Sequence, residues 1–283
     1  MTEARKSTAT LAAAIVVYRS DPQWLNRTLA SLAASLAYAR KVNALSAATI
    51  VLVDNATNAQ ASSHAELLQR HFPPGHTLLI SRVLAGHGNV GYGAALNMAF
   101  ADAGRPDYLL VLNPDVDIER SAIANALTYL AVTPDCDMIT PVATDACGAP
   151  LYLVKDYPAV FTLAIRGYAP KFVRAWFRQR LVTYDRANHA FESSLVDAKI
   201  VSGCFMLMRQ RVFAAANGFD PAYFLYFEDF DLSYRISMQA KIVRLPSCRI
   251  VHGGGHAARK GLHHAWLFVR SAYRFFCRHG WRW

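Results

Sequence analysis

Two carboxylates with spacing suited to a metal ion stand in the segment NPDVD, directly after the apolar run DYLLVLN. Asp115 and Asp117 are two residues apart there. If the turn after Pro114 lets them converge, they can bind one Mg²⁺ or Mn²⁺ ion and leave positions open for diphosphate oxygens. This spacing predicts a metal site. The alternative is that acids in such a loop only form the turn.

A second acidic cluster lies in FLYFEDFDLSYRI, where Glu228, Asp229 and Asp231 alternate with aromatic residues. Crowded carboxylates beside aromatic rings repel one another and lose solvent, which raises the pKa of at least one of them. A carboxylate with a raised pKa is suited to act as a general base near neutral pH. We therefore predict a catalytic role, although acids at a helix N-terminus are also stabilised by the helix dipole.

A third cluster is RIVHGGGHAARKG, with His252 at the end of an expected strand and Arg259 and Lys260 in a glycine-rich loop. A neutral imidazole can complete a metal site begun by carboxylates, and the basic pair can hold phosphate. Glycines let the backbone approach a ligand closely. For His252 the alternative is an ordinary core histidine.

The elements that must position these clusters are read from hydrophobic patterning. Over the first 140 residues, short apolar runs alternate with helical patterns, which is typical of β-α-β units in a parallel sheet covered by helices. Ligands of such sheets bind at the carboxyl ends of the strands. The ends of the expected strands are polar: Tyr18-Arg19, Asp54-Asn55 and Asn113 to Asp117.

The segment GHGNVGYG spells G-x-G-x-x-G with Gly86, Gly88 and Gly91, so an NAD-dependent oxidoreductase is an alternative reading. A dinucleotide fingerprint belongs on the first βα turn, but that turn reads YRSDPQ here and the glycines follow the third expected strand. We therefore interpret the segment as a flexible lip beside a nucleotide crevice.

Composition places the chain among globular proteins. Of its 283 residues, 53% are hydrophobic and 18% are charged. A chain of this length and composition can bury the core of one large domain, or of one domain with an appendage. Five scattered cysteines without a C-x-x-C pair favour a reducing cytosol over a disulfide or zinc framework. No uncharged apolar run reaches the ~18 residues of a spanning helix, and LAAAIVVY is expected to be a buried strand rather than a signal peptide. The prediction is a soluble or membrane-peripheral protein.

Positive charge is concentrated near the C-terminus. The net charge is +10, and ten basic residues but no acidic one follow Asp231. A helix in this segment would carry an apolar stripe and a basic stripe, consisting of Leu262, Trp266, Val269, Tyr273 and Phe276, and of Arg270, Arg274, Arg278 and Arg282. Such a helix can lie on an anionic bilayer, or it can pack on the domain with its arginines in solvent. The aromatic and basic stretch 145–195 can likewise face a membrane or pack on the core, or it can form a binding cleft.

The combination of these motifs, with SGCFMLMRQRVF between them, resembles family 2 glycosyltransferases of the GT-A fold, within them the rhamnosyltransferase-type enzymes of bacterial polysaccharide and O-antigen assembly. The resemblance covers residues 11 to 275. It implies an α/β fold with a Rossmann-like, mostly parallel sheet flanked by helices and a C-terminal basic amphipathic helix. The expected organisation is a tail (1–10), a catalytic domain (11–255, divided into a nucleotide-binding half 1–115 and an acceptor half 116–255) and a basic helical segment (256–283).

The resemblance also implies roles for individual residues. Asp229 matches the acceptor-activating base, with Glu228 and Asp231 orienting it or the sugar. Asp115, Asp117 and His252 match the metal site, with Asp117 the direct ligand. The residues expected to bind the nucleotide sugar are Tyr18, Asp54, Asn89, Gly91, Asn97, Asp115, Ser202, Gly203 and Arg259. Arg19 departs from the Tyr-Asn that often ends the first strand in this family, which weakens the expectation for that loop.

The implied activity is inverting, metal-dependent transfer of a sugar from a nucleotide sugar to a hydroxyl of a saccharide or lipid-linked acceptor. The favoured donor is dTDP-L-rhamnose, with a UDP-sugar as the alternative, and Mg²⁺ or Mn²⁺ is the expected cofactor. A cytoplasmic location is expected, with possible attachment to the inner membrane surface. A non-catalytic nucleic-acid or lipid-binding protein is a further alternative, disfavoured because acidic clusters lie beside the expected crevice. Oligomeric state is left open.

Overall fold

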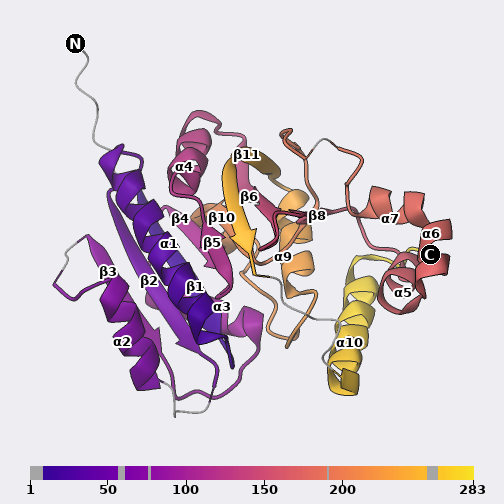
Figure 1. Cartoon of the computed structure of the whole chain (residues 1–283), viewed down its shortest axis with the longest axis horizontal. Helices are drawn as coiled ribbons and strands as arrows, with labels where there is room; N and C mark the ends of the chain where they lie inside the picture. The colour runs from indigo at the N-terminus through magenta and orange to yellow at the C-terminus, as the bar shows by residue number, and fades with distance from the viewer. Residues whose placement is uncertain (1–8, 57–60, 76–77, 190, 254–260) are drawn as a thin grey trace.

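The computed structural model describes residues 9–56, 61–75, 78–189, 191–253 and 261–283 (Figure 1). In its N-terminal half, strands and helices alternate as the sequence predicts. They are β1 (Thr10–Val17), α1 (Pro22–Lys41), β2 (Ala47–Asp54), α2 (Ala61–His71), β3 (Leu79–Leu84), α3 (Tyr92–Asp102) and β4 (Tyr108–Leu112). Asp21 caps α1, because its carboxylate accepts hydrogen bonds from the Gln23 and Trp24 amides.

The C-terminal half is less regular. Its elements are β5 (Val116–Ile118), α4 (Ala122–Val132), β6 (Cys136–Thr144), β7 (Pro150–Leu151), β8 (Val154–Lys155), α5 (Val160–Tyr168), α6 (Lys171–Trp176), α7 (Arg178–Tyr184), β9 (Ile200–Val201), β10 (Phe205–Arg209), α8 (Gln210–Ala215), α9 (Glu228–Ser237), β11 (Lys241–His252) and α10 (Gly261–His279). The predicted boundary at residue 255 lies outside the described residues.

One large sheet runs through both halves in the order β3-β2-β1-β4-β10-β6-β11-β5, with β7 paired to β6. The stretch β3-β2-β1-β4 is parallel, and so is the pair β6–β11. Strands β10 and β5 join antiparallel to their neighbours. Val17 lies opposite Asp54, and Ile15 opposite Leu112, so the carboxyl ends of β1, β2 and β4 share one edge.

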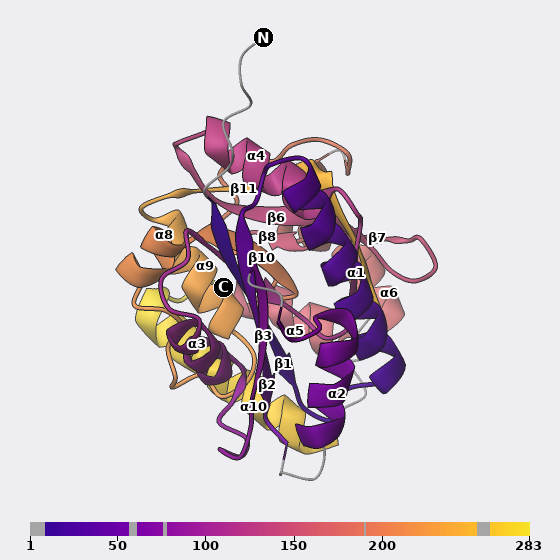
Figure 2. The same cartoon turned by 90° about the vertical axis from the view of Figure 1, so that its left-hand side faces the viewer.

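Helices cover both faces of this sheet (Figure 2). Helices α1, α2 and α4 pack on one face around buried leucines such as Leu29, Leu32 and Leu127. Helices α3, α8 and α9 pack on the other face, around Leu96, Phe219 and neighbouring methionines. The expected α/β fold, a sheet flanked by helices, is confirmed.

Helix α10 completes the fold by packing on an aromatic cluster formed with α9 and the segment before α5. The face it buries differs from the predicted stripe. The buried positions are Leu267, Ser271, Phe275 and Phe276. Trp266, Val269 and Tyr273 of the predicted stripe are instead 56%, 57% and 62% exposed. Because both faces of the helix carry apolar residues, periodicity alone did not identify the packed one.

None of the helices in the described part of the chain is long and apolar enough to cross a bilayer.

Candidate active site

The strand edge formed by β1, β2 and β4 carries the predicted nucleotide contacts. Tyr18 follows β1 and is half exposed. Asp54 ends β2 and is almost fully buried. Its Oδ1 accepts a hydrogen bond from the Ala56 amide at 2.8 Å, and its Oδ2 lies 2.9 Å from His64 Nδ1. The Asp54 carboxylate thus stabilises the turn after β2. Asn55, beside it, donates from Nδ2 to the Gly91 carbonyl at 3.1 Å.

The glycine-rich loop follows β3 and closes over this edge. Asn89 Oδ1 accepts a hydrogen bond from the Gly91 amide at 3.1 Å. Gly91 has a φ of 91°, and a Cβ there would lie 2.6 Å from the Phe224 carbonyl oxygen. Only glycine fits this left-handed, crowded position. The loop therefore connects the β2 end to the segment that leads into α9, rather than to the first βα turn.

Tyr92, at the start of α3, ties three parts of the site together. Its hydroxyl donates to Asn113 Oδ1 at 2.7 Å and lies 3.1 Å from the Gly203 carbonyl oxygen. Burial, followed by the charges of Glu228 and Asp229, raises the pKa of Tyr92 well above its ordinary value. Asp115 adds to the same effect. The acidic clusters predicted from sequence therefore surround one buried phenol.

Asp115 and His252 meet as predicted. Asp115 Oδ1 lies 3.2 Å from His252 Nε2, and the Gly253 amide donates to the Asp115 carbonyl at 2.7 Å. His252 Nε2 is buried, and the angles of its approach to Asp115 do not make a hydrogen bond. A buried imidazole nitrogen beside a carboxylate, without a hydrogen bond, suits a shared divalent cation. No group of three such ligands occurs among the described residues, so substrate oxygens and water would have to supply the rest.

Asp117 does not join this pair. It lies within β5, where its Oδ2 accepts hydrogen bonds from Arg27 of α1 at 2.7 Å (Nε) and 2.6 Å (Nη2). The guanidinium neutralises the carboxylate and holds it against α1. The structure thus pairs Asp117 with Arg27 and Asp115 with His252.

The second acidic cluster begins after a strained turn. Tyr226 and Phe227 both have left-handed backbone conformations, with φ of 68° and 64°. Each such residue costs about 1–3 kcal/mol and persists only where its surroundings enforce it. Phe227 is enforced by ring contacts with Phe230, Phe268 and Phe275 at 5.1–5.4 Å between centroids. This turn sets the direction in which Glu228 and Asp229 leave the first turn of α9.

Asp229 is held by backbone amides. Its Oδ2 accepts from Gly203 at 2.8 Å, and its Oδ1 accepts from Phe230 at 2.9 Å. A Cβ on Gly203 would lie 3.1 Å from Asp229 Cβ, so glycine permits this close approach. Burial raises the pKa of Asp229, and the backbone hydrogen bonds oppose that rise. The result is an oriented carboxylate with increased basicity, as a general base requires.

Glu228 is more deeply buried than Asp229. Its Oε2 makes no hydrogen bond among the described residues. Burial, followed by the charge of Asp229, raises the pKa of Glu228 well above its ordinary value. A protonated Glu228 would remove charge repulsion from its neighbour, which assigns it a supporting role beside Asp229.

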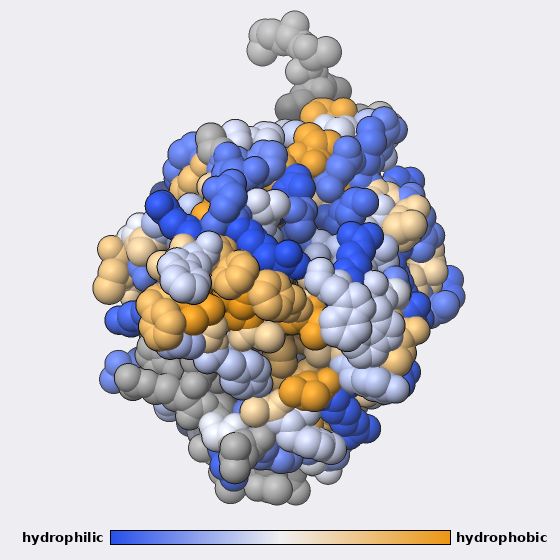
Figure 3. Space-filling view, turned by 90° about the vertical axis from the view of Figure 1, so that its right-hand side faces the viewer, coloured by the Kyte–Doolittle hydropathy of each residue, from blue (hydrophilic) through white to orange (hydrophobic). Residues whose placement is uncertain are grey.

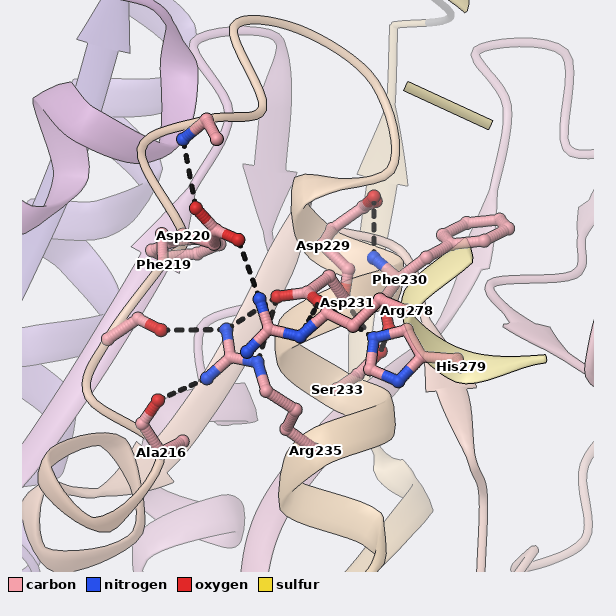
Figure 4. Close-up of polar contacts among 12 residues, drawn as sticks. Ala216, Phe219, Asp220, Asp229, Phe230, Asp231, Ser233, Arg235, Arg278 and His279 are labelled. Carbon is pink, nitrogen blue, oxygen red and sulfur yellow. Dashed lines mark hydrogen bonds and ion pairs between the residues drawn. The ribbon is translucent and has the colours of Figure 1, made fainter. Parts of the chain in front are cut away.

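Asp231, which the sequence pattern groups with Asp229, contacts Arg235 and residues of α10 instead of the groups around Asp229 (Figure 4). Its side chain is fully buried and binds Arg235 at 2.7 Å and His279 Nε2 at 2.8 Å. Burial alone would raise the pKa of Asp231, but hydrogen bonding by His279 and the charge of Arg235 outweigh it and lower the pKa. Because i and i+2 on a helix point in different directions, Asp231 faces α10 while Asp229 faces Gly203.

We expect Asp231→Asn to destabilise the protein by about 3 kcal/mol, because it leaves Arg235 buried without its charged partner. The lowered pKa implies that this contribution is present above the ordinary aspartate pKa, near 4, and is lost as pH falls through the lower folded-state value. Chemical denaturation from pH 7 down to pH 3 measures both effects. Asp102→Asn, which removes the half-exposed pair with Arg82, is the control and should cost less than about 1 kcal/mol. Equal losses in the two variants would contradict the assignment.

Asn97 and Arg259 are two further residues predicted to contact the nucleotide sugar. Asn97 lies on α3 and exchanges two hydrogen bonds with the backbone of Phe219, at 2.8 and 2.9 Å. Its side-chain amide therefore fixes the loop before the strained turn. Arg259, with His256 and Lys260, lies outside the described residues. Ser202 precedes Gly203 and lines a cavity beside His252.

Sequence reasoning missed several members of the site. Tyr92 was hidden inside a segment chosen for its glycines, and His64 lies in a helix without any catalytic pattern. Lys155, which lines the same cavity as Ser202, stands in a segment with no recognisable motif. For all three residues, the contact with the site becomes apparent only when their neighbours in the structure are known.

Comparisons with known proteins identify the family to which the chain is similar. The family model described as "Glycosyltransferase like family 2" matches residues 9–249. The N-acetylglucosaminyl-diphospho-decaprenol L-rhamnosyltransferase of Mycobacterium tuberculosis (strain ATCC 25618 / H37Rv) is 30% identical over 94% of this chain and 84% of its own length. Rhamnosyltransferase WbbL of Escherichia coli (strain K12) is 26% identical over 68% of this chain and 72% of its own.

Among solved structures, that of GalNAc-T7 with UDP, GalNAc and Mn²⁺ is similar in fold, with a TM-score of 0.61 and 14% sequence identity. The similarity covers 95% of this chain and 47% of that one. At this level of identity the likeness concerns the fold, which is the GT-A fold.

Proposed function

The chain belongs to glycosyltransferase-like family 2 and is a glycosyltransferase, and from this premise we propose that it is an inverting, metal-dependent rhamnosyltransferase acting on a lipid-linked saccharide. The observation that carries the proposal is the placement of Asp229. Its carboxylate is held by the Gly203 amide, and the buried Tyr92 hydroxyl links Gly203 to the strand edge near Asp115. A base and a cation-binding pair thus border one crevice.

Asp229 acts as the base in this proposal. An acceptor hydroxyl gives its proton to Asp229 and attacks the anomeric carbon of the donor from the face opposite the nucleotide, so the configuration at that carbon inverts. The raised pKa of Asp229 brings its proton affinity closer to that needed near neutral pH. General-base catalysis of this kind contributes roughly 10² to 10⁴-fold.

Asp115 and His252 would hold the divalent cation in this proposal. Their carboxylate oxygen and imidazole nitrogen, 3.2 Å apart, form a donor set suited to Mg²⁺ or Mn²⁺. The bound ion would offset the negative charge of the departing diphosphate. In the protein itself, Gly253 fixes the Asp115 backbone, and Arg27 keeps Asp117 away from the ion-binding pair.

The proposed donor is dTDP-L-rhamnose, because two similar proteins are rhamnosyltransferases. The test incubates the purified chain and Mn²⁺ with dTDP-L-rhamnose, UDP-N-acetylglucosamine or GDP-mannose, and with alkyl-diphospho-N-acetylglucosamine as the acceptor. We expect a rhamnosylated product from the first donor only. The anomeric configuration by NMR reports inversion or retention. Transfer from another donor alone, or retention, would contradict the proposal.

We propose that a lipid-linked acceptor is met at an anionic membrane, on the cytoplasmic face. Exposed large apolar side chains gather on α5, α6, α10 and the residues after it, a surface here called the aromatic face. It consists of Phe161, Tyr168, Phe172, Trp176, Trp266, Val269, Tyr273, Trp281 and Trp283. Figure 3 shows apolar side chains across the middle of this side, bordered by hydrophilic ones. Interfacial aromatic rings with basic neighbours are typical of membrane-surface elements.

Basic residues lie beside the aromatic face, although some arginines of the predicted basic stripe form contacts within the domain instead. Arg274 and Arg278 bind Asp220 at 3.1 and 2.6 Å, and Arg282 stacks on Tyr157. Arg270 lies over Trp266 on the exposed side of α10. The helix thus packs on the domain with one face and presents an apolar and basic side outward, which supports the proposed membrane contact.

We expect the triple substitution Trp266→Ser, Val269→Ser and Tyr273→Ser to reduce binding to phosphatidylglycerol vesicles at least about tenfold, because three interfacial contacts are lost. Co-sedimentation measures the change. A control with Val42, Val132 and Met238 replaced by Ser removes equally exposed apolar residues elsewhere and should bind as the wild type does. Unchanged binding in the first variant, or equal loss in both, would contradict the membrane assignment. Truncation before α10 is unsuitable, because it also removes the buried Phe275.

A further inference from the structure

A cavity of about 400 Å³ lies beside the candidate active site, and no role in the steps above uses it. Its walls come from the segment around β7 and β8, from α5 and the end of α7, and from the site itself. Ser202 adjoins Gly203, which holds Asp229, and Phe230 follows Asp229 in the chain. His252, whose Nε2 lies 3.2 Å from Asp115, also lines the cavity. The cavity therefore adjoins both the proposed base and the cation-binding pair.

The cavity carries two cations and one carboxylate. Lys155 Nζ lies 2.5 Å from Asp185 Oδ1, and Arg166 Nη2 lies 3.6 Å from the same oxygen. Both cations also approach the ring of Tyr184, at 6.0 and 5.6 Å from its centroid. The Lys155 side chain is only 11% exposed. Asp185, whose side chain is 24% exposed, is the one carboxylate shared by the two cations, so one positive charge among these three groups is uncompensated.

Lys155 is poorly solvated, and this lowers its pKa. Burial, followed by the charge of Arg166, lowers the pKa of Lys155 to about 8 despite the nearby Asp185. A buried ammonium gains stability from an additional anion, because the local dielectric constant is lower than that of water. The cavity is thus arranged to accept a negatively charged group.

The position of the cavity favours an anionic group of the acceptor over the nucleotide of the donor. The nucleotide crevice is formed by the ends of β1, β2 and β4, whereas this cavity lies on the side of Ser202, Phe230 and α5. A group bound here would reach Asp229 from the acceptor side. A volume of about 400 Å³ accommodates a phosphate or diphosphate together with part of a sugar ring.

We propose that Lys155 and Arg166 form an acceptor subsite that binds a phosphate or diphosphate ester carried by the acceptor next to the sugar that is glycosylated. This inference rests on the proposed glycosyl transfer to a lipid-linked saccharide and adds the residues that recognise its anionic linkage. Arg166 offers a planar donor pair for phosphate oxygens, while Lys155 supplies a charge from the cavity wall. Asp185 holds the two cations in place when the site is empty.

The test compares two acceptors that differ only in charge: alkyl-diphospho-N-acetylglucosamine and the neutral alkyl glycoside of the same sugar. For the wild type we expect kcat/KM to favour the diphosphate acceptor at least about tenfold. Lys155→Met and Arg166→Gln should each remove most of this preference by lowering kcat/KM for the diphosphate acceptor, and should leave the KM of the donor near the wild-type value. Lys155→Arg should retain the preference. The matched control is Arg211→Gln, which breaks an ion pair with Asp137 away from the cavity and should change neither ratio.

Three results would overturn the subsite: no preference in the wild type, an unchanged preference in Lys155→Met, or a change confined to the donor KM. If neither acceptor is glycosylated, the proposed function fails, and the subsite is tested separately by calorimetry with the diphosphate compound in EDTA. There the wild type should bind, and Lys155→Met should bind at least about tenfold more weakly. Absence of wild-type binding, or equal binding by the two, would also overturn the inference.

Discussion

Replacement of Asp229 by Asn is expected to slow sugar transfer by about 10² to 10⁴-fold, because it removes the proton acceptor and leaves the shape of the site unchanged. The Asn side chain retains an oxygen that can accept the Gly203 hydrogen bond. Binding of dTDP, measured by calorimetry, should stay near the wild-type value. The raised pKa of Asp229 adds a pH signature: kcat/KM in the wild type should rise with pH through a value above that of an ordinary aspartate.

Glu228→Gln is the matched control for this experiment. The raised pKa of Glu228 favours its neutral form, and Gln resembles a neutral glutamic acid in shape and charge. We therefore expect activity within about tenfold of the wild type, well short of the general-base effect. If Glu228→Gln is as inactive as Asp229→Asn, or if Asp229→Asn transfers sugar at the wild-type rate, the base has been assigned to the wrong residue.

Replacement of Asp115 by Asn is expected to abolish stimulation by Mn²⁺ or Mg²⁺ and to reduce kcat/KM at least about 10²-fold, since charge neutralisation at the leaving group is worth several kcal/mol. Asn cannot supply the anionic oxygen that now lies 3.2 Å from His252 Nε2. Metal titration of the transfer rate after treatment with EDTA measures the effect. The wild type should lose activity in EDTA and recover it with added ion.

Asp117→Asn provides the sharpest comparison, because family resemblance and structure disagree about this residue. Its carboxylate is paired with Arg27, so we expect metal stimulation to persist and the rate to fall less than about tenfold. Thermal unfolding of both variants checks that the fold is intact. If Asp117→Asn loses metal dependence and Asp115→Asn retains it, the ligand order implied by the sequence is right and the geometric assignment is wrong.

The fold was largely predictable from sequence because its signals are local. Apolar runs such as LAAAIVVY and TIVLVD are long enough to identify buried strands, and Asp21 with Pro22 marks the start of α1. The direction of β10 was not predictable in this way. Its apolar run has the same pattern in a parallel or an antiparallel neighbour, and only the surrounding topology decides.

The site was predictable in position but not in the partner of each side chain. Residues that follow β4 and residues that begin α9 lie close enough to Tyr92 for their charges to raise its pKa. Asp231 and Asn97 have equally suggestive types, yet their polar atoms are used by His279 and by the Phe219 backbone. Both partners lie far away in the chain, so no local pattern distinguishes a ligand-binding amide or acid from one that fixes the fold.

The left-handed turn at Tyr226 and Phe227 depends on a helix that is synthesised after it. Two of the rings that pack on Phe227 belong to α10, namely those of Phe268 and Phe275. His279 of α10 also binds Asp231, two residues after the proposed base. A nascent chain that ends before residue 261 has every proposed catalytic side chain but lacks these contacts. The turn that precedes the proposed base is therefore stabilised by a helix that comes later in the chain and carries none of the proposed catalytic side chains.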